Sequence, residues 1–414
     1  MNKLYYFIIL LFALVLIPDF GALDRANTQW LYLSCIPFFF LITNFKSLFF
    51  KSSLFKSAPL IIYCLFIFQV FLSLFYTNNF SISVIDFCRH LTLFFLILVL
   101  ISVFKKNQFS FYKLSLIISL FLVYESVISL RPLFYYIYKT GDFFLSTVTK
   151  VDIDPFKGLT GNRNIATAST VIKLPFLFYL VFRSKYFLKF IFTTVALLPL
   201  LTLFIINSRA ALLSLILGVI LISFFTVLYD RKRLINLLFV YLIIFSSFSI
   251  SQRILPNDSG QVVERLESIN FTNESSSNRF FLWDNAWDYI QHHPFIGCGI
   301  GNWKVESAAY WGSNGSQYIV PFHAHNDFLE FTTELGLIGG LSYLMFFIYI
   351  LYIFFTSYLR DRDLKYLILI VSFSALFIDS MLNFPFERPI IQSMFVLLSA
   401  LGIHYNFLNN VKKA

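Results

Sequence analysis

The sequence predicts an all-α polytopic membrane protein, a chain that crosses a membrane many times as helices. Apolar runs of about 20 residues, the length that a spanning helix needs, recur from one end of the 414-residue chain to the other. Hydrophobic residues make up 58% of the chain and charged residues only 13%, whereas about a quarter is usual in a soluble domain. The basic residues also concentrate in alternate connections, as the cytoplasmic loops of membrane proteins require.

About twelve apolar runs are long enough to be spanning helices. No small-residue cleavage site follows the first run, so we expect it to remain as a helix and not to be removed as a signal peptide. The predicted spans are residues 4–18, 29–44, 58–76, 82–104, 111–130, 165–182, 187–206, 209–229, 234–250, 335–358, 364–382 and 389–408.

The distribution of Lys and Arg predicts the orientation of these spans. If the N-terminus is cytoplasmic, the inner segments hold 18 of the 32 basic residues, and each inner segment holds at least one. The short outer loops hold only Arg25, Arg209 and Arg388. Both termini are therefore expected in the cytoplasm. The net charge of +10 is explained by topology and by contact with membrane lipids, so it does not predict nucleic-acid binding.

Two long segments fall on the outer side, residues 131–164 and 251–334. The second is too long for an ordinary connection, which marks it as functional or disordered. The chain is accordingly expected to have about nine spans in residues 1–250, a large loop on the outer side in 251–334, and about three spans in 335–414. Within the loop, "RFFLWDNAWDYIQHHP" predicts an amphipathic helix. Its apolar residues at helical spacing are Phe280, Trp283, Trp287 and Ile290, with Asn278 as cap and Pro294 as stop.

Several arginines lie at the predicted outer surface, where a lipid diphosphate would have its anionic head. A guanidinium stays charged and donates in a planar fork, which suits phosphate. Arg209 begins the eighth span, where the helix dipole disfavours a cation, so we expect it to have an anionic partner or ligand. Arg279 opens the amphipathic helix. For Arg163 and Arg388, snorkelling of the side chain to the membrane interface is an equal alternative.

The stretch "PFHAHNDFLEF" adds a titratable group on the same side. His323, His325 and Asp327 have a spacing that could bind zinc, but a metallo-hydrolase would require further ligands, and the outer side offers only His292 and His293 in a separate segment. We therefore expect no metal. Asn326 or Asp327 can cap the next helix, which would hold a neutral His325 at the helix N-terminus as a general base. A hydrogen-bonded interfacial histidine is the alternative.

Ionisable residues inside the predicted spans need partners because charge is costly in lipid. Asp86 lies three residues before Arg89 and four before His90, so an internal ion pair within the bundle is expected. Three further groups could pair across helices or line a polar cavity: Glu125, Lys173 and Asp379.

The order of these motifs resembles the O-antigen ligase and polymerase superfamily of bacterial membrane glycosyltransferases. The family pattern is P-x-x-G-x-G, then an H-N pair with a hydrophobic residue, then E-x-G-x-x-G. The matching residues are Pro294, Gly297 and Gly299; His325, Asn326 and Leu329; and Glu334, Gly336 and Gly339. The segment "GNRN" with Asn162, Arg163 and Asn164, the segment "SRAALL" with Arg209, and "FPFERPIIQ" with Arg388 are also similar to the family. The resemblance covers roughly residues 155–400.

This resemblance implies a GT-C-like helical bundle in the bacterial inner membrane, with the active site on the periplasmic side. It implies a metal-independent enzyme without cofactor that moves a glycan from undecaprenyl diphosphate to an acceptor hydroxyl, with inversion. A ligase would use lipid A–core as acceptor, and a polymerase would use a growing glycan. The resemblance makes His325 the candidate base or acceptor-orienting group. It makes Arg209 and Arg279 the candidate diphosphate ligands, with Arg163 as a further one.

The residues alone leave rival functions open. Ligase and polymerase share one donor, and we favour the ligase because of the compact "HAHND" region and the single large outer loop late in the chain. A transporter of lipid-linked oligosaccharides would be expected to have polar residues through the bundle and inverted repeats, neither of which is found in the sequence. A structural membrane protein would leave Arg209 and the glycine–histidine pattern unexplained.

Overall fold

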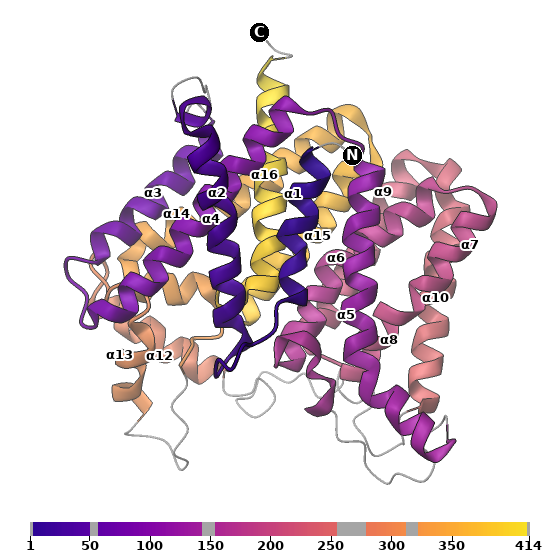
Figure 1. Cartoon of the computed structure of the whole chain (residues 1–414), viewed down its shortest axis with the longest axis horizontal. Helices are drawn as coiled ribbons and strands as arrows, with labels where there is room; N and C mark the ends of the chain where they lie inside the picture. Colours follow the sequence, from indigo (N-terminus) through magenta and orange to yellow (C-terminus); the bar gives the residue numbers. More distant parts are fainter. Residues whose placement is uncertain (1–2, 50–56, 143–153, 255–278, 312–321, 412–414) are drawn as a thin grey trace. The chain divides into compact units, whose positions relative to one another are not determined.

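A computed structural model of the chain describes residues 3–49, 57–142, 154–254, 279–311 and 322–411 (Figure 1). Every regular element in these ranges is helical, and they contain no strand. This confirms the predicted all-α membrane fold. Long apolar runs form helices because only a helix satisfies every backbone hydrogen bond within its own segment in lipid.

The chain forms two compact units, and each takes segments from different parts of the sequence. Unit 1 consists of Met1–Gln29, Asn107–Ile269 and Phe354–Ile378. Unit 2 consists of Trp30–Lys106, Asn270–Ile353 and Asp379–Ala414. The boundaries that the sequence predicts, at residues 250 and 334, separate groups of spanning helices from a long loop and do not define compact units. That division stays a prediction.

Unit 1 holds the helices of the chain's first and middle parts. They are α1 (Lys3–Phe12), η1 (Ala13–Leu16), α5 (Phe111–Thr140), η3 (Asp154–Thr160), α6 (Arg163–Arg183), α7 (Tyr186–Val195), α8 (Leu197–Ile206), α9 (Arg209–Tyr229), η4 (Arg231–Arg233), α10 (Leu234–Ile254) and most of α15 (Leu364–Leu382). Helix α6 is buried from Ile165 to Phe182 and packs against α5, α7, α8 and α9. It is the central helix of this unit.

Unit 2 holds the helices that flank the predicted loop. They are most of α2 (Arg25–Phe49), α3 (Ala58–Ser73), α4 (Phe80–Lys106), α12 (Arg279–His292), α13 (Trp303–Trp311), the first part of α14 (Asp327–Asp361), η5 (Pro385–Glu387) and α16 (Pro389–Val411). Helix α16 packs along α4. Helices α12 and α13 lie beside the end of this unit at which α16 begins, away from the C-terminus (Figure 1).

Nine helical segments of the described residues are long and apolar enough to cross a membrane. The predicted runs 4–18 and 58–76 form shorter apolar helices, Lys3–Leu16 and Ala58–Ser73. The run at 29–44 lies inside α2, which is not among the nine. The remaining predicted spans coincide with the nine, so a multi-pass membrane protein is confirmed, while the total of twelve stays a prediction.

In unit 1 the predicted outer connections meet at one end of the helices. A hydrophobic cluster there joins the later part of α5, η3, the start of α6 and the ends of α8 and α10. Its buried members are Leu130, Leu133, Phe156, Ala166, Ile205, Ile206 and Ile254. Because α6 and α9 both begin at this end, Arg163 and Arg209 belong to the same end of the unit. This is the arrangement that alternating spans predict.

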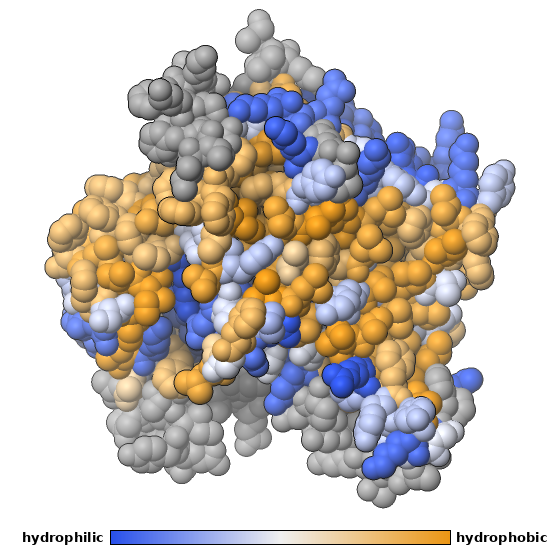
Figure 2. All heavy atoms as spheres, in the orientation of Figure 1, coloured by the Kyte–Doolittle hydropathy of each residue, from blue (hydrophilic) through white to orange (hydrophobic). Residues whose placement is uncertain are grey.

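The sides of these helices carry exposed hydrophobic residues. Hydrophobic side chains cover the middle of the unit 1 helices seen in Figure 2, and hydrophilic ones gather near the helix ends. On α9 and α10 the large exposed hydrophobic residues include Leu213, Ile220, Phe224, Leu238 and Phe245. Such side chains suit contact with lipid tails, as expected for spanning helices.

The amphipathic helix predicted after residue 278 is present as α12, but its buried face differs from the predicted one. Leu282, Ala286, Tyr289 and Ile290 are buried, whereas Trp287 is 53% exposed. Of the predicted apolar face only Ile290 is fully buried, because the packing partners of α12 contact the face one residue further round the helix. Asn278, the predicted cap, lies outside the described residues.

Candidate functional site

The His-Asn-Asp segment forms the start of α14. The side-chain oxygen of Asn326 accepts hydrogen bonds from the backbone N–H groups of Phe328 and Leu329 at 3.0 and 3.2 Å. Asn326 is therefore the N-cap. Asp327 is buried and accepts instead from the backbone N–H of Phe386, at 3.2 Å. His325 directly precedes the cap with φ +53°, a left-handed backbone that non-glycine residues seldom adopt.

Helix α14 is broken at Gly336, and the glycine-rich loop 294–301 fills the break. Gly336 has φ +72° and ψ 179°, a conformation essentially confined to glycine. The backbone N–H groups of Cys298 and Gly299 donate to the carbonyls of Thr333 and Glu334, which would be unpaired at the break, at 3.0 and 2.9 Å. The backbone N–H of Leu337 donates to the carbonyl of Pro294 at 2.8 Å.

Glycine is needed at this junction because two backbones touch. A Cβ on Gly297 would overlap the carbonyl of Thr333, and a Cβ on Gly336 would overlap that of Phe295. The family pattern P-x-x-G-x-G and the later E-x-G therefore form one structural joint. Glu334 belongs to it as well, since its carboxylate accepts from the backbone N–H of Trp303 at 3.2 Å.

Asn302 fastens the same loop to the turn between α3 and α4. Its side-chain nitrogen donates to the hydroxyls of Thr77 and Ser83 at 2.6 and 2.8 Å, and its oxygen accepts from the backbone N–H of Asn79 at 2.8 Å. Asn302 is fully buried. The sequence prediction did not assign it a role, although it stands directly after the glycine pattern.

The segment "FPFER" brings several predicted residues together. The ring of Phe384 stacks on His323 at a centroid distance of 4.5 Å and meets His325 edge-on at 4.9 Å. The guanidinium of Arg388 lies 5.7 Å from the same ring. Phe386 stacks on His90 at 4.0 Å. One short turn thus contacts three histidines and contains one of the predicted arginines.

Arg279, whose charge acts on His325, is anchored by a chain of hydrogen bonds. Its guanidinium donates to the side-chain oxygen of Asn383 at 3.1 Å, and the Asn383 amide donates to Asp379. Asp379 is buried, and so is Asn383. The sequence suggested that Asp379 pairs across helices or lines a polar cavity. Its hydrogen-bond partner is Asn383, four residues further along.

Further charges surround this cluster. Arg89 pairs with Asp86 at 2.9 Å, as predicted, and also with Glu387 at 2.7 Å. Lys304 lies 3.9 Å from Asp86. Burial opposes ionisation of Glu387, but the cations Arg89, His323, Lys304 and Arg388 outweigh it and lower the pKa of the carboxyl. Arg89 thereby ties the 384–388 turn to α4.

The pKa values of the two neighbouring histidines, His323 and His325, are shifted in opposite directions. Burial and the positive charges of Arg279 and His323 lower the pKa of His325 to about 4, so its imidazole is neutral at physiological pH. His323 lies 2.9 Å from Glu330. Burial disfavours its charge, but Glu330 outweighs this and the pKa of His323 is raised.

The remaining predicted site residues, Asn162, Arg163, Asn164 and Arg209, belong to unit 1. Asn162 is the N-cap of α6, and its side-chain oxygen accepts from the backbone N–H groups of Asn164 and Ile165 at 2.9 and 3.4 Å. Arg163 is the first residue of α6, and Arg209 is the first residue of α9. Both are partly buried. A common role of these arginines with Arg279 and His325 stays a prediction.

Unit 1 also contains a buried ion pair within its helices. Lys173 of α6 pairs with Glu125 of α5, and Ser169 donates to Glu125 at 2.8 Å and accepts from Lys173 at 2.7 Å. Lys173 is fully buried. The pairing of Glu125 with Lys173 across helices is confirmed.

Among the residues that the structure describes, no three His, Cys, Asp or Glu side chains are arranged to hold a metal ion. Part of the predicted loop lies outside the described ranges. Metal independence therefore stays a prediction.

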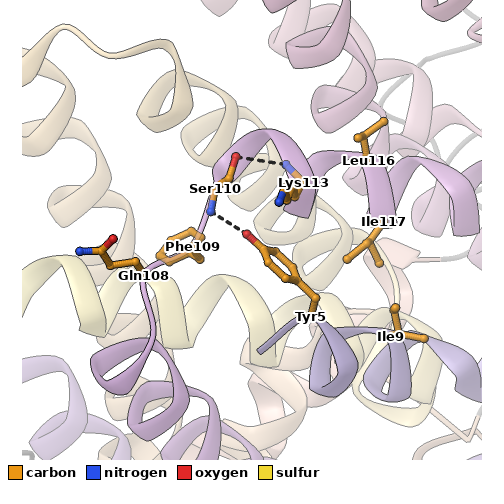
Figure 3. A pocket seen from close by; sticks show the side chains of 8 residues that line it. All are labelled: Tyr5, Ile9, Gln108, Phe109, Ser110, Lys113, Leu116 and Ile117. Atoms are coloured by element: carbon orange, nitrogen blue, oxygen red, sulfur yellow. Dashed lines mark hydrogen bonds between the residues drawn. The ribbon is translucent and has the colours of Figure 1, made fainter. Parts of the chain in front are cut away.

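A pocket of about 680 Å³ lies between α1 and the start of α5 in unit 1 (Figure 3). The hydroxyl of Tyr5 accepts from the backbone N–H of Ser110 at 2.7 Å at its rim, and Lys113 is its cationic lining residue. The first residues of α5 line this pocket. The hydrophobic cluster near Arg163 and Arg209 contains residues of α5 that lie about 30 Å further along the helix. The pocket is therefore separate from the predicted outer end.

Residues 192–344 of the chain match the O-antigen ligase family. The match contains Arg209, Arg279, His325 and the whole glycine joint. A Rickettsia felis protein provisionally named a polysaccharide ligase is 30% identical over 129 residues, which are 28% of this chain and 30% of that protein. The alignment thus spans less than a third of the relative. The predicted resemblance is confirmed over the matched segment.

Proposed function

We propose that the protein is a ligase-type glycosyltransferase of polysaccharide synthesis, working at the periplasmic face of the bacterial inner membrane. It moves a glycan from undecaprenyl diphosphate to an acceptor hydroxyl, with lipid A–core as the expected acceptor. The observation that carries the proposal is the position of His325 beside Arg279, on one end of unit 2, within the segment that matches the O-antigen ligase family.

The chemistry needs a cation at the leaving group and a polar group at the acceptor. The acceptor oxygen attacks the anomeric carbon, the bond from that carbon to the diphosphate oxygen breaks, and the configuration inverts. The released diphosphate gains negative charge, which the guanidinium of Arg279 can stabilise because Asn383 fixes it in advance. The acceptor hydroxyl loses its proton, and His325 serves as the base or orients the hydroxyl.

The burial of His325 supports its role at the acceptor hydroxyl. His325 is neutral because of its surroundings, so one ring nitrogen can accept a hydrogen bond from the acceptor hydroxyl. The edge of its ring rests against Phe384, which limits its rotation. A fixed imidazole next to a fixed guanidinium is suited to hold an acceptor opposite a leaving group.

Arg209 and Arg163 are predicted from the sequence to bind the same diphosphate. Arg209 begins a helix, where only an anion would offset the unfavourable dipole. Variants at each position test this part of the proposal separately from the residues of unit 2.

The decisive experiment incubates the purified protein with undecaprenyl-diphosphate-linked glycan and lipid A–core. Glycan on lipid A–core is the expected product, and chelation with EDTA should not reduce it. Arg279→Ala, Arg209→Ala and His325→Ala should each lower the rate by about 100-fold or more. Arg360→Ala and His292→Ala serve as controls because both residues are exposed.

Other products would change the assignment. Longer glycans still attached to the carrier would make the protein a polymerase. Unchanged substrates with folded protein would remove the transferase function. Full activity in both Arg209→Ala and His325→Ala would reject the proposed mechanism.

A further inference from the structure

His323 forms a carboxylate–imidazole pair that the sequence pattern does not assign. Its Nδ1 atom lies 2.9 Å from Oε1 of Glu330, while Oε2 of Glu330 accepts from the backbone N–H of Ala324 at 2.9 Å. Both side chains are mostly buried, with 19% and 13% of their surface exposed. Glu330 is thus fixed by two donors, and it selects the tautomer of His323 with the proton on Nδ1.

This arrangement leaves Nε2 as the ring nitrogen that remains for a substrate. The plane of the ring is fixed too, since it stacks on Phe384 with an angle of 14° between the rings. A carboxylate at Nδ1 increases the basicity of Nε2 because it stabilises the imidazolium that forms when a proton arrives. His323 therefore has the orientation and the partner of a general base.

His325 has different surroundings and is a weaker base. Its Nδ1 atom is buried and has no hydrogen-bond partner among the described residues. The nearby charges of Arg279 and His323 oppose a proton on it. An imidazole in these surroundings accepts a hydrogen bond well but does not readily keep a proton.

The charged groups around His323 come from three other elements. Glu330 of α14 and Glu387 of η5 favour its protonated form, while burial and Lys304 of α13 oppose it. The guanidinium of Arg388 lies over the ring of Phe384, the ring on which His323 stacks. The two acids prevail, and the closer of them is Glu330.

We propose that the His323–Glu330 pair takes the proton of the acceptor hydroxyl, and that His325 orients that hydroxyl. This inference rests on the proposed function. The O–H bond breaks, the proton moves to Nε2 of His323, and the oxygen electron pair forms the bond to the anomeric carbon. The bond to the diphosphate breaks, its electron pair remains on the diphosphate oxygen, and His323 later returns the proton to water.

The test compares the pH dependence of the transfer rate in the wild type, Glu330→Gln, His323→Gln and His325→Gln. A base acts only when unprotonated, so the wild-type rate should rise with pH through the pKa of His323. Glu330→Gln should move that limb to lower pH by about one unit or more. His323→Gln should lose the limb and about 100-fold in rate. His325→Gln should be slow without a displaced limb.

A second readout does not depend on transfer. Diethylpyrocarbonate reacts with neutral imidazole, and mass spectrometry of the modified peptide gives the titration of His323 itself. Its midpoint should lie above pH 6.5 in the wild type and fall in Glu330→Gln. Glu306→Gln is the matched control, because that acid contacts Asn78 and not a histidine.

The outcomes separate the two proposals. Transfer with an unmoved limb in Glu330→Gln, or wild-type rates in His323→Gln, overturns the role of the pair and leaves the transferase function intact. A wild-type protein that transfers no glycan, but whose His323 titrates as expected, overturns the proposed function and the proton transfer that rests on it.

Discussion

The guanidinium of Arg279 donates a hydrogen bond to the side-chain oxygen of Asn383, 104 positions later in the chain, at 3.1 Å. Asn383 in turn donates to Asp379, so one amide connects an acid of α15 with a predicted diphosphate ligand. The segment that leads into the 384–388 turn therefore takes part in orienting this arginine, although it lies far from Arg279 in the sequence.

We expect Asn383→Ala to lower the transfer rate by about 10- to 100-fold, the effect of losing a hydrogen bond to a charged group. The protein should remain folded, because Arg279 is still present to contact its surroundings. Steady-state transfer assays measure the effect. Asn406→Ala is the control, since Asn406 bonds to Ser57 at the other end of α16, and a loss of rate there as large as in Asn383→Ala would argue against a specific role.

Gly336→Ala should destabilise the protein by about 1–3 kcal/mol, the usual cost of a backbone conformation that only glycine adopts freely. The added Cβ would also displace the carbonyl of Phe295 and loosen the joint. Thermal unfolding in detergent measures the change. Gly218→Ala in α9 is the comparison, because Gly218 does not have a positive φ and its Cβ would meet one side-chain methyl of Val371 and no backbone atom. Equal stability of the two variants would contradict the assigned role of Gly336.

Lys173→Met should cost about 3–5 kcal/mol because it leaves Glu125 buried without its cation. The double variant with Glu125→Gln should recover most of this loss, since neither remaining group is charged. The unfolding transition of each variant gives the comparison. Lys365, which is half-buried and pairs with Asp363 near the protein surface, is the control, and Lys365→Met should change stability by less than about 0.5 kcal/mol.

The protein should lose stability through His325 as the pH falls from 6.5 to 4. The folded pKa of about 4 lies below the ordinary value of 6.5, so in this window the unfolded chain binds a proton that the folded protein does not. His323 does not mask this, because its raised pKa makes its contribution complete below pH 6.5. The melting temperature of His325→Gln should therefore decline less steeply. A parallel decline in wild type and variant would contradict the lowered pKa.

Much of the fold follows from the sequence because lipid imposes a simple rule on it. An apolar run must form a helix, so the helices from α4 to α10 and from α14 to α16 coincide with the predicted spans. Basic residues add the direction of alternate segments. Neither signal says which face of a helix is buried against protein. This is why the buried face of α12 was misassigned although the helix itself was correct.

The candidate site was predictable only in part. His325, Arg279 and Asn326 stand in a recognisable order, and the structure brings them together at one end of unit 2. The pairing of His323 with Glu330 spans seven residues and fits no capping pattern, so no local signal indicates it. The contact of Arg89 with Glu387 joins positions 298 apart, and only the folded chain brings them within 2.7 Å. Phe384 likewise carries no charged or titratable group, so the sequence does not mark it as a residue of the site.

The break in α14 has a consequence for how such proteins can be recombined. The carbonyls at Thr333 and Glu334 are satisfied by a loop more than thirty residues earlier, and Asn302 of the next turn is fixed by Thr77 and Ser83. A chimera that exchanges only the histidine helix between relatives would separate these backbones from the partners they evolved with. The natural unit of exchange is the loop, the broken helix and the α3–α4 turn together, and grafts that respect it should preserve the fold.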